Sequence, residues 1–105
     1  SYVNDSIEWI AVNTNDSSAL VTNNHAIAYF SGKVEDYDLV QRNLTEEEIL
    51  SSEVGDTIVA ELTFETRKLL ESNAITDKLK VLAYFPDTQA QRIAIFERVY
   101  SSTSE

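Results

Sequence analysis

The N-terminal third of the chain alternates apolar and polar residues with the period of a half-buried strand. This pattern predicts a first strand over residues 7–12 and two more over residues 19–22 and 25–30. The last two flank Asn23-Asn24, and asparagine tolerates the positive φ angles that a two-residue hairpin turn needs. We therefore expect one strand followed by a β-hairpin in this part of the chain.

The middle of the chain carries helix signals. Thr45 and Glu48 have the spacing of a capping box, in which each side chain bonds the other residue's backbone N–H. The helix that begins there should end near Gly55. Residues 56–72 are ambiguous, because 57–64 alternates like a strand whereas a helical projection gathers the apolar side chains within an arc of about 120°. We predict a helix over 56–72 and keep a strand followed by a helix as the alternative.

The C-terminal third predicts a β-hairpin. Residues 78–85 and 92–100 both alternate and are rich in β-formers, and Pro86 opens the connection because it cannot donate to a strand ladder. One face of this hairpin would carry Leu79, Val81, Ala83, Phe85, Ile93, Ile95 and Val99.

These elements predict one α+β domain over residues 1–105. Its antiparallel sheet would come from the N-terminal strands and the C-terminal hairpin, with the two central helices packed on one face. The tail over residues 101–105 is expected to fray.

Composition excludes several kinds of site. The 105 residues include no Cys and one His, which excludes disulfides, cysteine-based metal centres and multi-histidine metal sites. With two Gly there is no glycine-rich phosphate loop, and no apolar run approaches the roughly 20 residues needed to cross a membrane. We therefore expect a cytoplasmic protein that is not an enzyme, with no cofactor, no metal and no membrane contact.

Negative charge is concentrated in the middle of the chain. The formal net charge is -10, to which residues 1–32 contribute -3, residues 33–65 contribute -8 and residues 66–105 contribute +1. One interpretation is an electrostatic docking face for a basic partner, and the other is a solvated helix face that keeps a small protein in solution. The charge argues against direct binding of duplex nucleic acid, because Lys and Arg are needed to bind phosphates.

The first candidate site is an acidic and aromatic segment over residues 35–38. Tyr37 would be an amphipathic anchor among carboxylates, and the alternatives are a solvated loop or a calcium site, although the usual calcium-loop pattern is absent. Phe64 is either an exposed contact residue on a helix or a core residue on a strand. The candidate partner-binding residues are Glu35, Asp36, Tyr37, Asp38, Glu46, Glu47, Glu48, Glu53 and Phe64.

Two other features allow a functional or a structural interpretation. His25 could act as a general base, but a histidine at a strand end is the simpler interpretation. The second face of the C-terminal hairpin interleaves aromatic and cationic side chains, which could stack single-stranded bases or cover an ordinary sheet face. Its members are Lys78, Lys80, Tyr84, Arg92, Phe96, Arg98 and Tyr100.

These patterns favour a small binding protein that acts through an acidic surface. The most specific hypothesis is an inhibitor of the immunity or antitoxin type, which would neutralise a basic toxin or nuclease with the carboxylates of residues 35–53. The alternatives are a secretion or assembly chaperone, a small ligand-binding or enzymatic α+β domain, and a virion or other structural component. An inhibitor is expected to be a monomer, a chaperone a homodimer with an exposed apolar patch, and an enzyme should show a pocket holding His25 or a close carboxylate pair.

Overall fold

The computed structural model describes residues 1–88 and 90–101. The described elements, in chain order, are α1 (Tyr2–Asn13), β1 (Leu20–Thr22), α2 (His25–Ser31), the 3-10 helix η1 (Tyr37–Leu39), α3 (Glu46–Leu50), β2 (Thr57–Glu61), α4 (Phe64–Leu70), α5 (Asn73–Thr76), β3 (Leu79–Phe85) and β4 (Ile93–Arg98). This mixture of helices and strands confirms the α+β class. Most of the tail expected to fray, residues 102–105, lies outside the described residues.

The strands form one mixed sheet in the order β1-β2-β4-β3. β1 and β2 run parallel, whereas β2 pairs with β4, and β4 with β3, in antiparallel fashion. The prediction of a purely antiparallel sheet is therefore wrong. Parallel neighbours cannot be joined by a tight turn, and the crossover between β1 and β2 contains α2, η1 and α3. The two edges of the sheet are β1 and β3.

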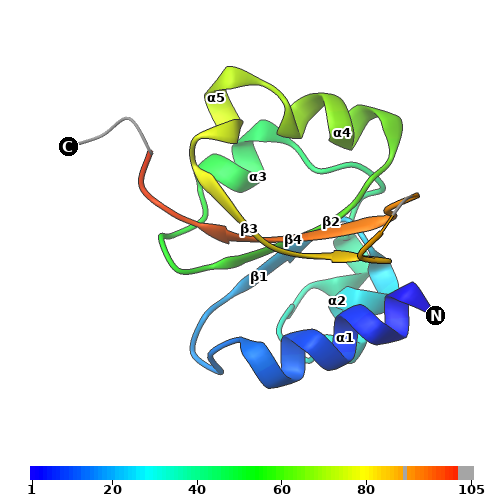
Figure 1. Cartoon of the computed structure of the whole chain (residues 1–105). Helices are drawn as coiled ribbons and strands as arrows, with labels where there is room; N and C mark the ends of the chain where they lie inside the picture. The colour runs from blue at the N-terminus through cyan, green and yellow to red at the C-terminus, as the bar shows by residue number, and fades with distance from the viewer. Residues whose placement is uncertain (89, 102–105) are drawn as a thin grey trace.

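Helices lie on both faces of the sheet rather than on one (Figure 1). On one face α1 and α2 pack Ile10 and Ile27 against the sheet, and on the other α3 and α5 contribute Ile49 and Ile75. The two central strands, β2 and β4, are consequently buried on both sides, and so their sequences are nearly continuous apolar runs.

The first predicted strand, residues 7–12, is wrong, because these residues belong to α1. The Ser1 side chain caps this helix by accepting from the backbone N–H of Asn4 at 3.3 Å. Ile7 and Ile10 are three residues apart, which places both on one helix face, whereas the alternation that predicted a strand rests on Ile7, Trp9 and Ala11. The pattern was therefore compatible with both periods, and burial against the sheet selects the helix.

The predicted hairpin over residues 19–30 is also wrong. Its first half is β1, but its second half is α2. Asn24 is the N-cap of α2, where its Oδ1 accepts from the backbone N–H of Ile27 at 2.9 Å, and Gly32 ends the helix in the left-handed region with φ 69°. These asparagines therefore begin a helix instead of turning a hairpin.

The capping box of Thr45 and Glu48 is confirmed at the start of α3, although the helix ends at Leu50, earlier than expected. The predicted helix over residues 56–72 is wrong, and the alternative of a strand followed by a helix is confirmed by β2 and α4. The reason is the double burial of β2. Ile58 packs on one face of the sheet and Val59 on the other, and so the strand alternation over 57–64 is interrupted by the apolar Val59.

The C-terminal hairpin is confirmed as β3 and β4. The prediction that its apolar residues share a single face is wrong for β3. A register shift between Val81 and Ala83 moves the side chains of this strand from one face of the sheet to the other. Leu79 therefore packs with the helices α3 to α5, whereas Ala83 and Phe85 pack with α1 and α2.

Candidate functional site

The outer side of β1 pairs with no other strand among the described residues, and its two outward-directed residues, Leu20 and Thr22, are each 5% exposed. On its inner side, the backbone oxygen of Ala19 accepts from Thr57 N–H at 3.0 Å, which fixes the residues of this strand that point toward β2. Because a parallel ladder alternates, the backbone groups of Leu20 and Thr22 point away from β2. Within residues 1–88 and 90–101, no hydrogen bond to these outward N–H and C=O groups is found. The edge therefore has unused donors and acceptors.

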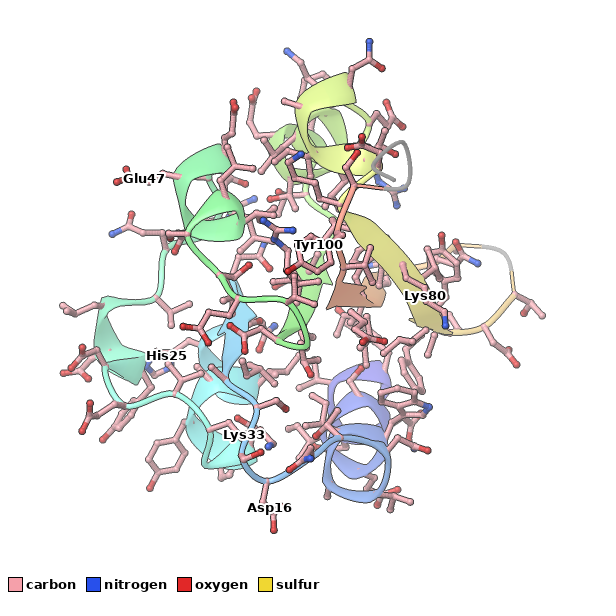
Figure 2. All side chains as sticks on the ribbon, turned by 90° about the vertical axis from the view of Figure 1, so that its left-hand side faces the viewer. Asp16, His25, Lys33, Glu47, Lys80 and Tyr100 are labelled. Carbon is pink, nitrogen blue, oxygen red and sulfur yellow. The ribbon has the colours of Figure 1, made fainter. Side chains whose placement is uncertain are left out.

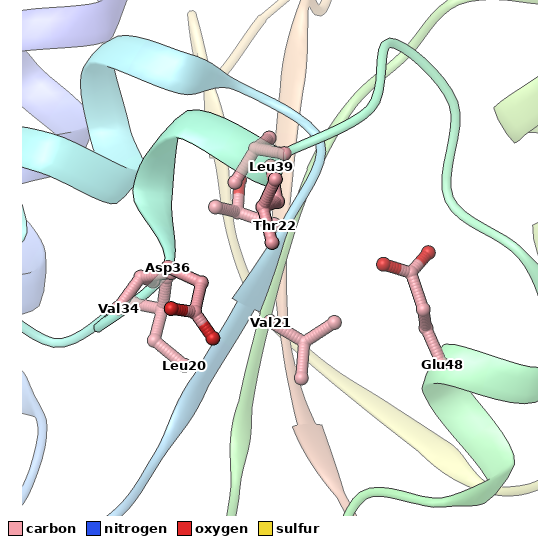
Figure 3. A pocket seen from close by; sticks show the side chains of 8 residues that line it. Leu20, Val21, Thr22, Val34, Asp36, Leu39 and Glu48 are labelled. Carbon is pink, nitrogen blue, oxygen red and sulfur yellow. The ribbon is translucent and has the colours of Figure 1, made fainter.

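A groove of about 340 Å³ runs beside this edge, and we refer to it as the β1 groove. The residues that line it are Leu20, Val21, Thr22, Val34, Asp36, Leu39, Val40 and Glu48. Its floor is largely apolar, and the carboxylates of Asp36 and Glu48 stand on either side of Val21 (Figure 3).

The two walls of the β1 groove come from different layers of the fold. Leu20 packs into the core beneath α1 and α2, beside Val34, whereas Val21 packs into the core beneath α3 to α5. Asp36 therefore lies on the side of the sheet covered by α1 and α2, and Glu48, on α3, lies on the opposite side (Figure 3). Segments about ten residues apart in the sequence thus place carboxylates on opposite faces of one strand.

Glu48 is held in place by the capping box. One of its carboxylate oxygens, Oε1, accepts from the backbone N–H of Thr45 at 2.9 Å and from the Thr45 hydroxyl at 3.1 Å. Glu46 and Glu47 are exposed on the same first turn of α3. Among the described residues, no Lys or Arg forms an ion pair with any of these three carboxylates or with Asp36. The charge of the groove and its rim is therefore not neutralised within this part of the chain.

An aromatic cluster borders the acidic segment, formed by His25, Tyr29, Phe30 and Tyr37. The Tyr37 ring packs edge-on against His25 and Tyr29, with ring centroids 5.9 and 4.9 Å apart, and Tyr29 packs in the same way on Phe30 at 4.8 Å. Tyr29 is 51% exposed and Phe30 66% exposed. Tyr37 is therefore a partly buried member of a larger aromatic surface rather than an isolated anchor.

The sequence analysis missed His25, Tyr29 and Phe30 as members of this surface because it assigned them to a strand. A signal was present in the chain, since an N-cap asparagine, Asn24, is followed after one short helix by Gly32. Leu39 was also missed, because the predicted acidic and aromatic segment ends at Asp38. It lines the β1 groove and is 70% exposed.

The remaining predicted residues lie at different distances from this site. Glu35 and Asp38 are exposed beside Asp36 on the acidic segment. Glu53 is exposed in the turn before β2, where its backbone N–H donates to the Asp56 carboxylate at 2.9 Å, and it is not a lining residue of the β1 groove.

Phe64 is the first residue of α4, is 72% exposed and lies outside the lining of the groove. The ammonium of Lys68, one turn along the same helix, lies 5.5 Å from its ring centroid. The structure therefore gives Phe64 a local partner and does not bring it to the acidic residues.

Positive charge is found at the opposite edge of the sheet. Lys80 on β3 is exposed, and in Figure 2 it lies on the other side of the molecule from Glu47 and His25. The hypothesis that the second face of the C-terminal hairpin is an exposed platform for stacking bases is wrong. Phe96 is buried, and the Arg98 Nε donates to the backbone oxygen of Ile49 at 3.2 Å, so these side chains join the sheet to α3.

His25 is placed by the structure at the start of α2, away from the β1 groove. In the described part of the chain there is no group of three or more His, Asp or Glu side chains that could hold a metal ion. His25 is exposed at the start of α2, with its ring against Tyr37, and it is not a lining residue of the β1 groove. None of the helices formed by the described residues is long and apolar enough to span a membrane.

The molecule therefore presents an edge strand, a largely apolar groove with two carboxylates on its walls, and a neighbouring aromatic cluster. No protein-family model, no curated protein and no solved structure matches this chain.

Proposed function

We propose that this chain is an acidic protein-binding module whose partner is a basic protein, and that it acts as an inhibitor of the immunity or antitoxin type against a basic toxin or nuclease. The observation that carries the proposal is that Asp36 and Glu48, which belong to two separate acidic segments, residues 35–38 and 46–48, line the same groove beside β1.

Electrostatics supports this choice of partner. At physiological ionic strength the screening length is about 8 Å, so a cation feels mainly the carboxylates that lie close together on one surface. The acids around the β1 groove meet this condition and have no cationic partner among the described residues. A basic protein would therefore be steered to this edge and would associate faster at low salt.

The aromatic cluster supports a protein rather than a small cation as the partner. Tyrosine and phenylalanine supply large contact areas with few rotatable bonds, and partly exposed aromatic residues are typical anchors of interfaces. Tyr29 and Phe30 lie next to the acidic segment and are held by edge-on ring contacts. A partner that covers the groove would bury apolar area beside its ion pairs.

The test is a pull-down with the whole chain and two matched double variants. Glu46→Gln with Glu47→Gln, the rim variant, removes two exposed charges from the first turn of α3, which also carries the groove residue Glu48. Glu65→Gln with Glu71→Gln, the α4 variant, removes two exposed charges from α4 and its C-cap. A basic protein should be retained at low salt and released at high salt. The rim variant should weaken its binding about tenfold, and the α4 variant should bind within about twofold of the parent chain.

Equal binding by the two variants, or the capture of no stoichiometric basic protein, would contradict this function. Inhibition is tested directly by assaying the captured protein's own activity with increasing amounts of this chain. If the captured protein keeps full activity when this chain is in molar excess, the inhibitor hypothesis is rejected, whereas the proposal of a binding module is retained.

A secretion or assembly chaperone is the second candidate, and the exposed aromatic side chains favour it. Tyr29, Phe30 and Leu39 present apolar surface beside the acidic segment. Binding of a client through this surface would resist salt, because burial of apolar area does not depend on charge screening. Sedimentation equilibrium separates the candidates further, since a homodimer is expected for the chaperone and a monomer for the inhibitor.

A further inference from the structure

We infer that the β1 groove binds an extended segment of the basic partner as an added strand beside β1, and that it selects two adjacent basic residues in that segment. This inference rests on the proposed function and specifies how the partner is recognised.

The backbone of β1 supplies the pairing groups. Leu20 and Thr22 each direct one N–H and one C=O outward, and within the described residues these groups have no hydrogen-bond partner. An extended peptide can add to such an edge because its own backbone alternates donors and acceptors with the same spacing. The groove beside the edge provides the space for that peptide.

The side walls determine which peptide fits. In an added strand, the residue next to Leu20 points to the same face as Leu20, and the residue next to Val21 points to the opposite face. The first face carries Asp36 and the second carries Glu48 (Figure 3). Two cationic side chains at consecutive positions would therefore each meet one carboxylate. Two cations separated by one residue would point to the same face and leave one wall without a partner.

A second copy of the chain is a poorer occupant than a basic partner. Its β1 edge would bring a second set of carboxylates to the same groove, and like charges oppose that approach. Its β3 edge carries Lys78 and Lys80, but these are two residues apart and cannot reach opposite walls from one regular strand. Charge and register together therefore point to a different protein.

The test compares two synthetic hexapeptides of the same composition by fluorescence anisotropy at low salt. The sequence Thr-Val-Lys-Arg-Val-Thr has adjacent cations, and Thr-Lys-Val-Arg-Val-Thr has them separated. The first should bind about fivefold or more tightly than the second. Asp36→Asn and Glu48→Gln should each reduce the affinity of the first peptide about fivefold, and the control Glu71→Gln should change it less than twofold.

These variants are chosen to preserve the fold. Glutamine replaces glutamate in capping boxes, so Glu48→Gln keeps the N-terminal cap of α3. Asp36 precedes η1 without a side-chain capping bond, so Asp36→Asn removes charge and no cap. Circular dichroism and an unchanged urea midpoint verify that each variant is folded.

Backbone pairing is tested by N-methylated peptides and by hydrogen exchange. Because amides alternate along a strand, N-methylation of the Lys amide and of the Arg amide should have unequal effects, one abolishing binding and the other being tolerated. On the protein, saturation with the peptide should slow exchange of the Leu20 and Thr22 amides about tenfold. The Val21 amide should change little, because it faces β2.

The outcomes separate this inference from the proposed function. If the isomeric peptides bind equally, or the two amides stay unprotected, while a basic protein is still captured and released by salt, strand addition is wrong and the binding module stands. If neither peptide nor basic protein binds, both proposals fail. Protection of the Leu20 and Thr22 amides that increases with protein concentration, without peptide, would assign the groove to a second copy and overturn the inference.

Discussion

The side chain of Asn23 continues the pairing of β1 with β2 beyond the last residue of the strand. Its Oδ1 accepts from the Glu61 N–H at 2.7 Å, and its Nδ2 donates to the Glu61 backbone oxygen at 2.9 Å. The same Nδ2 donates to the backbone oxygen of Arg42 at 2.9 Å and to the Thr66 hydroxyl at 3.2 Å. Asn23 therefore joins β1, β2, the crossover and α4, and we predict that Asn23→Ala is among the more destabilising polar substitutions.

The magnitude follows from the partners that remain after truncation. A hydrogen bond contributes about 0.5–1.5 kcal/mol net, and a buried group left unpaired costs about 1–3 kcal/mol. The Glu61 oxygen keeps the Thr63 N–H at 2.9 Å, and the Thr66 hydroxyl keeps the Leu44 N–H at 3.2 Å. The Glu61 N–H and the backbone oxygen of Arg42 lose their hydrogen bonds to the Asn23 side chain. The free energy of unfolding should therefore fall by about 2–3 kcal/mol.

Urea unfolding followed by the fluorescence of Trp9 measures this change. Trp9 is the single tryptophan and is partly buried against the core beneath α1 and α2, so its emission reports on unfolding. With a slope of about 1.5 kcal/mol/M for a small domain, the midpoint should fall by about 1.3–2 M. Asn4→Ala, at an exposed position of α1, is the matched control and should stay within about 0.5 kcal/mol of the parent chain.

A double-mutant cycle tests the cause of the loss. Thr66→Val removes the hydroxyl that Asn23 contacts while keeping the shape of the side chain, and it should cost about 1–2 kcal/mol by itself. If the two residues act together, the double variant should lose less than the two single losses combined. Equal midpoints for Asn23→Ala and Asn4→Ala would refute the reasoning. Additive losses in the cycle would leave the role of Asn23 but reject its coupling to Thr66.

Five further substitutions, at four positions, test other parts of the structure by the same urea assay. Thr45→Ala should cost about 1 kcal/mol and Thr45→Ser much less, because serine keeps the cap of α3; equal losses would contradict the capping box. Ile58→Ala should cost about 2–5 kcal/mol, whereas Val81→Ala, on the exposed part of β3, should cost less than about 1 kcal/mol; the reverse order would contradict the burial described. Phe64→Ala should change stability by less than about 0.5 kcal/mol and leave the salt-sensitive binding of a basic protein unchanged, because Phe64 lies outside the β1 groove.

The parts of the fold that were predicted correctly are those with local signals. The capping box of Thr45 and Glu48 is complete within four residues, and the hairpin of β3 and β4 combines two strong strand patterns with Pro86 between them. Neither signal depends on what packs above or below. Such elements can be recognised from a single sequence because the atoms that decide them are neighbours in the chain.

The parts that were predicted wrongly depend on distant contacts. Ile7 and Ile10 fit one face of a helix, Ile7, Trp9 and Ala11 fit one face of a strand, and packing against the sheet distinguishes the two. β2 was predicted as part of a helix because both of its faces are covered, so the apolar Val59 interrupts the alternation of a half-buried strand. The parallel pairing of Leu20 with Thr57 joins residues far apart in the sequence and has no local pattern at all.

The acidic character of the candidate site was predictable, but its geometry was not. A count of charges locates the acids between residues 33 and 65. It does not show that the crossover wraps around the edge of the sheet, and this path is what places Asp36 and Glu48 on opposite faces of β1. The polarity of the site is therefore a property of composition, whereas its ability to distinguish one partner from another is a property of topology.

An open edge strand is a hazard for a small domain, because it offers unpaired backbone groups to any other chain. β1 reduces that hazard by being only three residues long and by lying between carboxylates. The same carboxylates that repel a second copy of this chain would attract a cationic segment, so protection against self-association and selection of a partner arise from one arrangement. Neutralising Asp36 and Glu48 together should accordingly have two effects: weaker binding of the peptide with adjacent cations, and greater self-association of the chain in sedimentation experiments. Loss of peptide binding without any gain in self-association would show that the length of β1, rather than its charge, keeps the edge free.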